Sequence, residues 1–379
     1  MRSFDVVRVR KLTDVTDGPF VGEGHPRFPG VRRIAVLRGG GLGDLMFAMP
    51  AMSALAAAYP EASLTLLGTP AARALLTGRP GPVDEVVELP FAEGVREGPV
   101  DVGKQEAFFA EMRGRSFDLA VQVHGGGRFS NPFLLQLGAR YTVGTRTDDA
   151  AGLDRNLPYI YYQNEMLRGL EVAALAGAPV HDLEARIEVT ADERGSGARL
   201  VGSGSAPVLA LHPGATDPRR RWPTSAFGDV VARATADGIR VVIVGDEGDA
   251  LLAEEILDAA GHPDGAVSFA GGLSLSELVG VLAVSDVMLG NDSGPRHLAV
   301  AAGTATVGLF WMGNLINAGP MGRARHRVHL SWVTRCPVCG VDVTQVGWTA
   351  QRCEHDPSFL AEIDPALVYD DVQALLGGR

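Results

Sequence analysis

The chain has 379 residues, 46% of them hydrophobic, and a formal net charge of −11 at pH 7. Its length exceeds one ordinary core and predicts two domains, and its acidic balance excludes a general affinity of the surface for nucleic acid. The apolar tracts fall well short of the roughly 20 residues that span a bilayer, and three cysteines are too few for a disulfide scaffold.

Residues 1–30 mix charged residues with Gly and Pro and contain no apolar stretch of the signal-peptide kind. We therefore expect an N-terminal extension and a cytoplasmic location. Residues 31–190 alternate short β-rich runs with longer helical patterns, which predicts βαβ units and a parallel sheet. The elements expected there are strand 34–37, helix 45–58, strand 63–67, strand 85–89, helix 106–113 and strand 119–123.

Residues 191–206 are polar and rich in Gly and Ser, without a helical or strand period, which predicts an interdomain linker. Residues 207–345 then repeat the α/β scheme, and residues 346–379 are expected to form a cysteine-containing tail with a last helix at 367–376. Two open α/β sheets joined by a linker bind ligands in the cleft between their carboxyl edges. The elements expected in the second half are strand 208–211, helix 226–236, strand 240–244, helix 250–259, strand 267–269, helix 275–283, strand 287–289, helix 295–301 and strand 306–310.

Two strand exits carry the most informative residues. The tract GNDSGPRHL at 290–298 follows an apolar strand and opens a helix at Pro295. Free backbone N–H groups and the helix dipole at such a start favour an anion. Far upstream, RGGGLGD at 38–44 gives a second strand a glycine-rich exit. The pattern predicts two such edges facing one cleft.

Four ordered segments, RIAVLRGGGLGDLMFAMPAMSAL, LHPGATDPRRRWPTSAF, VGDEGD and GNDSGPRHLAVAAGTATVGLF, resemble glycosyltransferase family 9, the ADP-heptose:lipopolysaccharide heptosyltransferase group. The resemblance covers about residues 31–376, and four ordered motifs are more specific than one glycine motif. It implies an α/β fold of the GT-B type, with two Rossmann-like domains whose open parallel sheets face a central cleft.

The resemblance also implies an inverting transfer that needs no metal cofactor. A heptose or related sugar would pass from an ADP-sugar, held by the C-terminal domain, to a hydroxyl on the N-terminal domain. The acceptor would be a glycan, a glycolipid or a small molecule, as in lipopolysaccharide biosynthesis. A peripheral position at the inner membrane face is a further option, and neither a transmembrane segment nor a nucleic-acid partner is expected.

Asp44 is the expected general base for the acceptor hydroxyl, because it matches the family's catalytic aspartate. The residue pattern alone favours a helix cap at Asp44. Gly43, directly before it, is assigned to the acceptor side.

The donor phosphates are assigned to residues that offer positive charge, a hydroxyl or backbone N–H groups. Arg220 matches the basic residue before the family's Trp-Pro, where Lys is usual, and the flanking Arg219 and Arg221 are expected to be solvated. Thr216 could instead be an ordinary loop residue, and His297 a structural histidine. The full expected set is Thr216, Arg220, Ser293, Gly294 and His297.

A carboxylate at Asp292 would be repelled by diphosphate, so we expect it to contact sugar hydroxyls. The resemblance assigns Asp249 to the ribose hydroxyls and Leu273 to the adenine. The alternatives for these two are a solvated acid at a helix start and a core leucine.

Acceptor binding is assigned to His124, Arg128 and Arg168. His124 and Arg128 follow the strand at 119–123 and resemble the family's strand-to-loop element. A solvated loop arginine is the alternative for Arg128.

Cys336, Cys339, Cys353 and His355 have the spacing CxxC then CxH. Three thiolates and an imidazole could close a tetrahedral structural zinc site, and packed free thiols are the alternative.

Three other functions stay open at the level of sequence. The same fold could use another nucleotide sugar on a natural-product or cell-envelope acceptor. A nicotinamide-dependent oxidoreductase would need an acidic residue about 20 positions after the glycines; Glu61 is near that distance, but GGGLGD is not GxGxxG. A non-catalytic nucleotide-binding module is the third.

Overall fold

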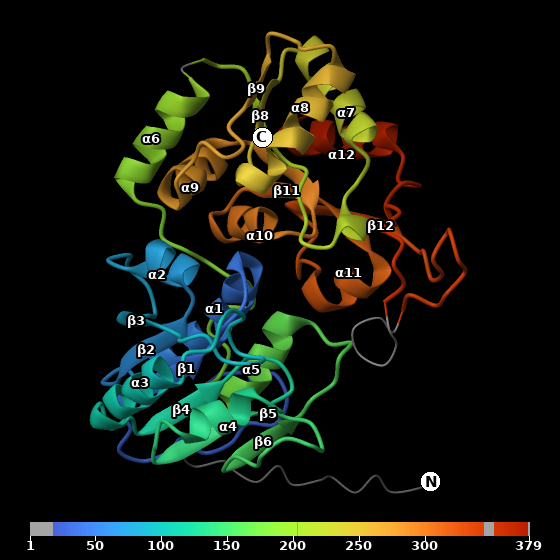
Figure 1. Cartoon of the computed structure of the whole chain (residues 1–379). Helices are drawn as coiled ribbons and strands as arrows, with labels where there is room; N and C mark the ends of the chain where they lie inside the picture. Colours follow the sequence, from blue (N-terminus) through green and yellow to red (C-terminus); the bar gives the residue numbers. More distant parts are fainter. Residues whose placement is uncertain (1–17, 203, 345–351, 378–379) are drawn as a thin grey trace, which may run out of the picture.

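The computed structural model describes residues 18–202, 204–344 and 352–377. It forms two α/β domains, one above the other in Figure 1, each with a six-stranded sheet in which every strand pairing is parallel. The expected two-domain α/β architecture is confirmed. Part of the expected N-terminal extension lies outside the described residues.

The first strand of the N-terminal domain lies at the centre of its sheet. Central parallel strands are buried on both faces, so their sequences are continuous apolar runs. Its strands are β1 (Arg33–Leu37), β2 (Ser63–Gly68), β3 (Glu85–Glu88), β4 (Leu119–Gln122), β5 (Tyr141–Arg146) and β6 (Arg155–Pro158). The helices of this domain are α1 (Leu42–Ala58), α2 (Pro70–Leu76), α3 (Val102–Gly114), α4 (Ser130–Leu135) and α5 (Glu165–Leu175).

The C-terminal domain repeats this arrangement. Its strands are β7 (Val208–His212), β8 (Arg240–Ile243), β9 (Ala266–Ser268), β10 (Val287–Asn291), β11 (Ala305–Trp311) and β12 (His326–Ser331). The α-helices that surround them are α7 (Thr224–Ala236), α8 (Ala250–Ala260), α9 (Leu275–Val284), α10 (Gly294–Ala301), α11 (Met312–Ala318) and α12 (Pro365–Gly377), and two 3-10 turns are η1 (Pro218–Arg220) and η2 (Glu247–Asp249).

Both sheets have the same strand order. The first is β3-β2-β1-β4-β5-β6 and the second, read from its other edge, is β9-β8-β7-β10-β11-β12. Each sheet therefore reverses its winding between two central strands, β1 and β4 or β7 and β10. Ligands of doubly wound sheets bind beyond the carboxyl ends of the strands at this point.

The expectation of an aperiodic linker at residues 191–206 is wrong, because Ala191–Val201 form helix α6. Thr190 and Glu193 make a capping box at its start, and its glycine face packs on α9. A Cβ at Gly197 would lie 2.2 Å from the backbone of Gly280. The sequence did not predict this helix, because its packed face consists of small residues and therefore lacks the helical spacing of large apolar side chains.

Helix α1 lies at the boundary of the two domains, where it packs against both α5 and α10 (Figure 1). It is apolar on nearly all sides, with ten of its residues buried, as expected for a helix between two layers. Its N-terminus and that of α10 therefore meet at the interdomain boundary. Within the described ranges, no helix is long and apolar enough to cross a membrane.

Candidate active site

A cavity of about 1060 Å³ lies between the two domains. Residues 41–44 line it from the N-terminal domain, and the loops after β7, β8 and β10 line it from the C-terminal domain. Two glycines allow the helix starts to approach. A Cβ at Gly43 would lie 3.2 Å from His297 Cδ2, and one at Gly294 would lie 3.1 Å from Leu42 Cβ. Both expected strand exits therefore face the same space.

Asp44 lines this cavity with 46% of its side chain exposed. One carboxylate oxygen accepts the backbone N–H of Gly41 at 2.9 Å, and the other accepts a hydrogen bond from Arg38 Nη2 at 2.6 Å. Asp44 therefore does cap α1, as the residue pattern alone favoured. The same carboxylate also faces the cavity, so capping does not remove it from the site.

Arg38 was missed in the sequence, although it stands at the end of a buried apolar strand. Its guanidinium is buried, donates to the carbonyl of Val123 and lies 3.7 Å from Glu165 Oε2. A buried arginine must be paired, and Arg38 is paired with both acids. His124 lies close by and binds Gly94 O at 3.0 Å. Burial, followed by the charge of Arg38, lowers the pKa of His124.

Asp292 is buried at the other wall of the cavity. Its Oδ1 accepts from His297 Nε2 at 2.9 Å, and its Oδ2 accepts from Asn314 Nδ2 at 2.9 Å and from Arg220 Nη1 at 3.3 Å. Burial raises the pKa of Asp292, but the His297 hydrogen bond and the charges of Arg296 and Arg220 outweigh it and bring the pKa to about 2. Asp292 is thus ionised and hydrogen-bonds to three other residues that line the cavity.

His297 is neutral at pH 7, because burial and the charge of Arg296 lower its pKa to about 4. Since Asp292 can only accept, Nε2 carries the proton and Nδ1 accepts from Arg296 at 3.0 Å. Arg296 is fully buried over the ring of Phe310, and burial lowers its pKa to about 10. The edge of Phe47 contacts the His297 ring across the domain boundary.

The loop after β7 is tied to its neighbours by a second missed residue. His212 Nδ1 is 2.9 Å from Ser293 Oγ, and Nε2 is 3.1 Å from Asp249 Oδ2. Asp249 lines the cavity together with Leu273, as expected, but it is buried rather than solvated. Burial raises the pKa of Asp249, and the His212 contact more than reverses this, so the pKa is lowered.

The three consecutive arginines have different environments. Arg220 and Arg221 line the cavity, and Arg221 Nε donates to Ala215 O at 2.9 Å. The expectation that Arg219 is solvated is wrong, because it is buried, pairs with Asp217 and lies over the Phe359 ring. Thr216 is exposed at the cavity wall.

Of the residues assigned to the acceptor, Gly43 lines the central cavity, whereas His124, Arg128 and Arg168 do not. Arg128 is exposed and lies 3.6 Å from Asp149. Arg168 is buried, pairs with Glu165 and donates to the Tyr161 carbonyl at 3.1 Å. These contacts use the guanidinium of Arg168 within the protein, and the acceptor roles of His124, Arg128 and Arg168 stay predictions.

Two asparagines on α11 were also missed, because this short helix has no sequence period. Asn317 Nδ2 donates to Tyr161 O at 2.8 Å across the domain boundary, whereas Asn314 Nδ2 donates to Asp292 within the C-terminal domain. The Oδ1 atoms of both amides are buried and lack a hydrogen-bond partner among the described residues. Both side chains line the central cavity and a smaller one of about 280 Å³ beside it.

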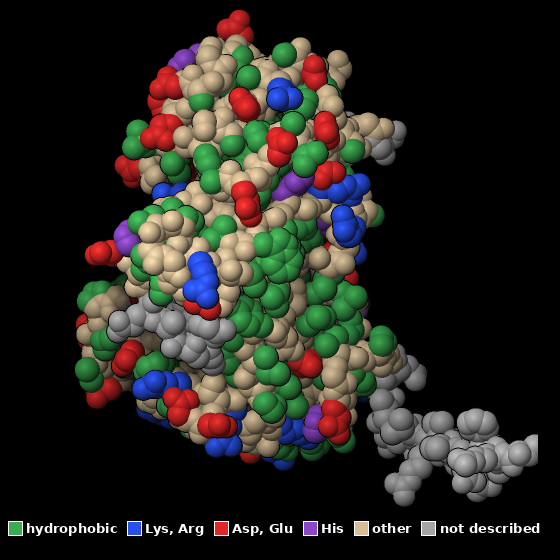
Figure 2. All heavy atoms as spheres, turned by 90° about the vertical axis from the view of Figure 1, so that its right-hand side faces the viewer, with side chains coloured by type: hydrophobic (Ala, Val, Ile, Leu, Met, Phe, Trp, Pro, Cys, Tyr) green, Lys and Arg blue, Asp and Glu red, His purple; other side chains and the backbone are tan. Residues whose placement is uncertain are grey.

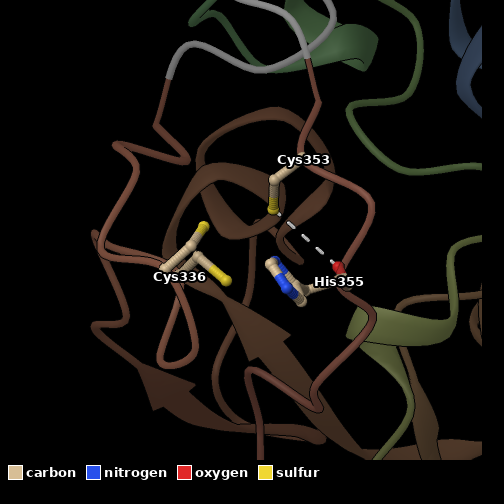
Figure 3. Close-up of side chains that lie close together, drawn as sticks. Cys336, Cys353 and His355 are labelled. Atoms are coloured by element: carbon tan, nitrogen blue, oxygen red, sulfur yellow. Dashed lines mark hydrogen bonds between the residues drawn. The ribbon is translucent and has the colours of Figure 1, made fainter.

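The four metal-ligand candidates of the tail come together outside the cavity. The Sγ atoms of Cys336, Cys339 and Cys353 and a ring nitrogen of His355 lie within 4.8 Å of one another. Figure 3 shows the labelled side chains of Cys336, Cys353 and His355 grouped between the loop after β12 and the segment before α12. The arrangement can hold a metal ion.

Comparison with known proteins gives a consistent result. The sequence model described as glycosyltransferase family 9 (heptosyltransferase) matches residues 106–336, more than half of the chain. Lipopolysaccharide heptosyltransferase 2 of Salmonella typhimurium is 24% identical over 361 residues, which cover 91% of this chain and 98% of the relative.

Two solved structures have the same fold. The E. coli ADP-heptose lps heptosyltransferase II has a TM-score of 0.70 and 20% identity, covering 91% of this chain and 98% of its own. A family 9 glycosyl transferase from Veillonella parvula has a TM-score of 0.72 and 16% identity, covering 92% of this chain and 98% of its own.

Proposed function

The chain belongs to glycosyltransferase family 9, and from this membership we propose that it transfers a heptose from ADP-heptose to a hydroxyl of a lipopolysaccharide core, with inversion. The relative from Salmonella, which is named for this acceptor class, supports the proposal over nearly its whole length. The observation that carries it is the shared cavity: Asp44 lines it from one domain, and Arg220 with the start of α10 lines it from the other.

On the donor side, Arg220 and the first turn of α10 neutralise the diphosphate. Ser293 precedes α10 without a side-chain cap hydrogen bond, because its hydroxyl is engaged by His212. The helix start therefore offers backbone N–H groups to phosphate oxygens, which the helix dipole favours. Thr216 adds a hydroxyl at the same wall.

On the acceptor side, Asp44 takes the proton of the attacking hydroxyl. The acceptor oxygen forms the new bond to the anomeric carbon, and the bond from that carbon to the phosphate oxygen breaks, with its electron pair leaving on ADP. Arg38 and the Gly41 N–H hold the carboxylate in one orientation, which such a transfer requires.

We assign the transferred sugar to the wall formed by Asp292, Asn314 and Asn317. Asp292 holds Arg220 and Asn314 through Oδ2, while Oδ1 holds His297. Asn314 and Asn317 line the same wall, and we assign their side-chain amides to the sugar hydroxyls. Asp249 supports the site by holding the side chain of His212. We assign the ribose of the donor to the edge of the cavity formed by Asp249 and Leu273.

Transfer needs no metal ion in this proposal, because fixed charges and helix N–H groups serve the leaving diphosphate. The cysteines and His355 do not line the cavity, so a metal ion bound by them would have a structural role. An oxidoreductase is no longer supported, given the family. Another nucleotide sugar as donor remains the alternative.

A lipid-linked acceptor would bring the enzyme to the inner face of the membrane. Figure 2 shows hydrophobic side chains gathered at mid-height on the face that includes α11. The rest of this face carries both polar and charged side chains, so the hydrophobic patch is a candidate surface for peripheral contact with lipid.

The test is transfer itself. The purified protein is incubated with ADP-heptose and a truncated lipopolysaccharide core, and the mass of the product is measured by mass spectrometry. We expect the mass of one added heptose together with free ADP. Product from UDP- or GDP-sugars alone, with none from ADP-heptose, would overturn the donor assignment.

A further inference from the structure

The turn that carries Cys336 and Cys339 is shaped around two sulfur atoms. Cys336 N donates to Val341 O and Gly340 N to Cys336 O, both at 2.8 Å. Gly340 has a φ of +71°, which favours glycine. These hydrogen bonds close a tight turn that brings the sulfur atoms of Cys336 and Cys339 close together.

The other two ligands come from the segment before α12. Cys353 and His355 meet the turn from the opposite side, with all four ligand atoms within 4.8 Å of one another. A tetrahedral site with bonds of about 2.3 Å has its ligand atoms roughly 3.5 to 3.8 Å apart. The observed upper limit of 4.8 Å is at most slightly wider than that geometry.

His355 supplies an independent indication. Its Nδ1 atom is buried and has no hydrogen-bond partner in the part of the chain that the structure describes. A buried polar atom of this kind is destabilising unless something binds it. A metal ion bound at this nitrogen would remove the deficit.

The cluster also connects to the donor site. Phe359, four residues after His355, donates its N–H to Arg219 O at 2.7 Å, and its ring lies under the Arg219 guanidinium. On the other side of the cluster, Thr344 O accepts a hydrogen bond from Tyr162 in the N-terminal domain. Arg219 directly precedes Arg220, so the segment that carries Cys353 and His355 supports the loop at the cavity wall.

We propose that Cys336, Cys339, Cys353 and His355 bind one zinc ion, which cross-links the turn after β12 to the segment before α12 and thereby fixes the loop that carries Arg220. Three thiolates and one imidazole close a tetrahedral shell, as in structural zinc sites. Iron is the other common ion for tetrahedral thiolate ligands. The link to the donor site rests on the proposed function; the ion site does not.

The first experiment measures metal in the full-length protein, purified without chelators, by plasma mass spectrometry. We expect about one zinc per chain, lost in Cys353→Ser and in His355→Ala. His262→Ala is the matched control, because His262 belongs to the second group of possible ligands, Glu254, Asp258 and His262, all exposed on or just after α8. It should keep the zinc.

Negligible metal in the wild-type protein, or zinc retained by Cys353→Ser, overturns the site. Stoichiometric iron overturns the choice of zinc. If the variants fail to fold, cobalt loaded into the wild-type chain decides: tetrahedral thiolate ligation gives intense visible and sulfur-to-cobalt charge-transfer bands, and their absence contradicts the site.

The second experiment measures ADP binding by calorimetry before zinc removal, after it and after zinc is restored. We expect removal to weaken ADP by about 2- to 30-fold, the range for positioning networks, and restoration to reverse the loss. Unchanged affinity overturns the link to Arg220. A zinc-loaded protein that never binds ADP contradicts the proposed function but leaves the zinc site standing.

Discussion

The buried guanidinium of Arg38 holds the half-exposed carboxylate of Asp44 at 2.6 Å, at the point where α1 enters the interdomain cavity. The same carboxylate caps the helix through Gly41. Asp44 therefore has two candidate roles, as a helix cap and as the catalytic base, and an experiment has to distinguish between them.

Asp44→Asn is expected to lower the transfer rate by about 10² to 10⁴, the usual contribution of a general base. Folding and ADP affinity should persist, because the amide oxygen of Asn can still accept the Gly41 N–H at the helix start. Transfer rates and melting temperatures are compared with those of Asp101→Asn, which changes the cap of α3 away from the cavity. Near wild-type transfer by Asp44→Asn would leave Asp44 as a cap only.

Arg220→Ala should weaken ADP binding by about 1.5 to 3 kcal/mol, the range for a hydrogen bond to a charged group. The measurement is calorimetry with ADP. Arg128→Ala is the control, because Arg128 is exposed and lies outside the cavity. Equal ADP affinities for the two variants would refute the assignment of Arg220.

Asn317→Ala should lower kcat/KM for the ADP-sugar by about 2- to 12-fold, as expected for one lost neutral hydrogen bond, while ADP affinity stays the same. Asn164→Ala is the control, since Asn164 also bridges the domains, through Gly319 O at 3.2 Å, without lining the cavity. A parallel loss of ADP affinity would argue against a contact with the sugar.

The lowered pKa of His297 predicts that the stability of the fold depends on pH. Its folded pKa of about 4 lies below the value of 6.5 for the unfolded chain, so the unfolded state binds more protons below pH 6.5. Stability is therefore lost as pH falls from about 6.5 towards 4, by on the order of 2 kcal/mol between pH 7 and 5.

Denaturant unfolding at these two pH values should show this loss in the wild type and in His262→Ala. In His297→Gln the difference should shrink, because Gln does not titrate. An equal loss in all three proteins would mean that His297 is not the cause.

Transfer should survive EDTA without added Mg²⁺ or Mn²⁺, since the phosphates are served by Arg220 and the start of α10. A strong chelator that removes zinc should instead lower the melting temperature. Dependence of the initial rate on a divalent cation, with the tail zinc still bound, would contradict this mechanism.

The sheets and the motif loops were predictable because buried parallel strands are continuous apolar runs followed by glycine-rich exits. Asp44, Arg220, Asp292 and Asp249 line the cavity as expected. Arg38 was missed because two of the groups that hold it in place, the Val123 carbonyl and Glu165, are distant in sequence. His212 was missed for the same reason, since Ser293 is 81 residues away.

Other elements were missed for local reasons. The edge strand β6 is the polar tetrapeptide RNLP, and it is specified by its pairing with β5 rather than by its own pattern. Helix α11 is only seven residues long, too short to show a helical period. The two asparagines that it carries into the site had no sequence signal.

The close approach of Gly43 and Gly294 places the amino ends of two packed helices side by side. Each end carries roughly half a positive elementary charge, so the two ends repel one another across the gap. A dianionic ligand between them acts as a counter-ion shared by both halves of the molecule. Bound nucleotide would then draw the two domains together, and its release would free them to separate.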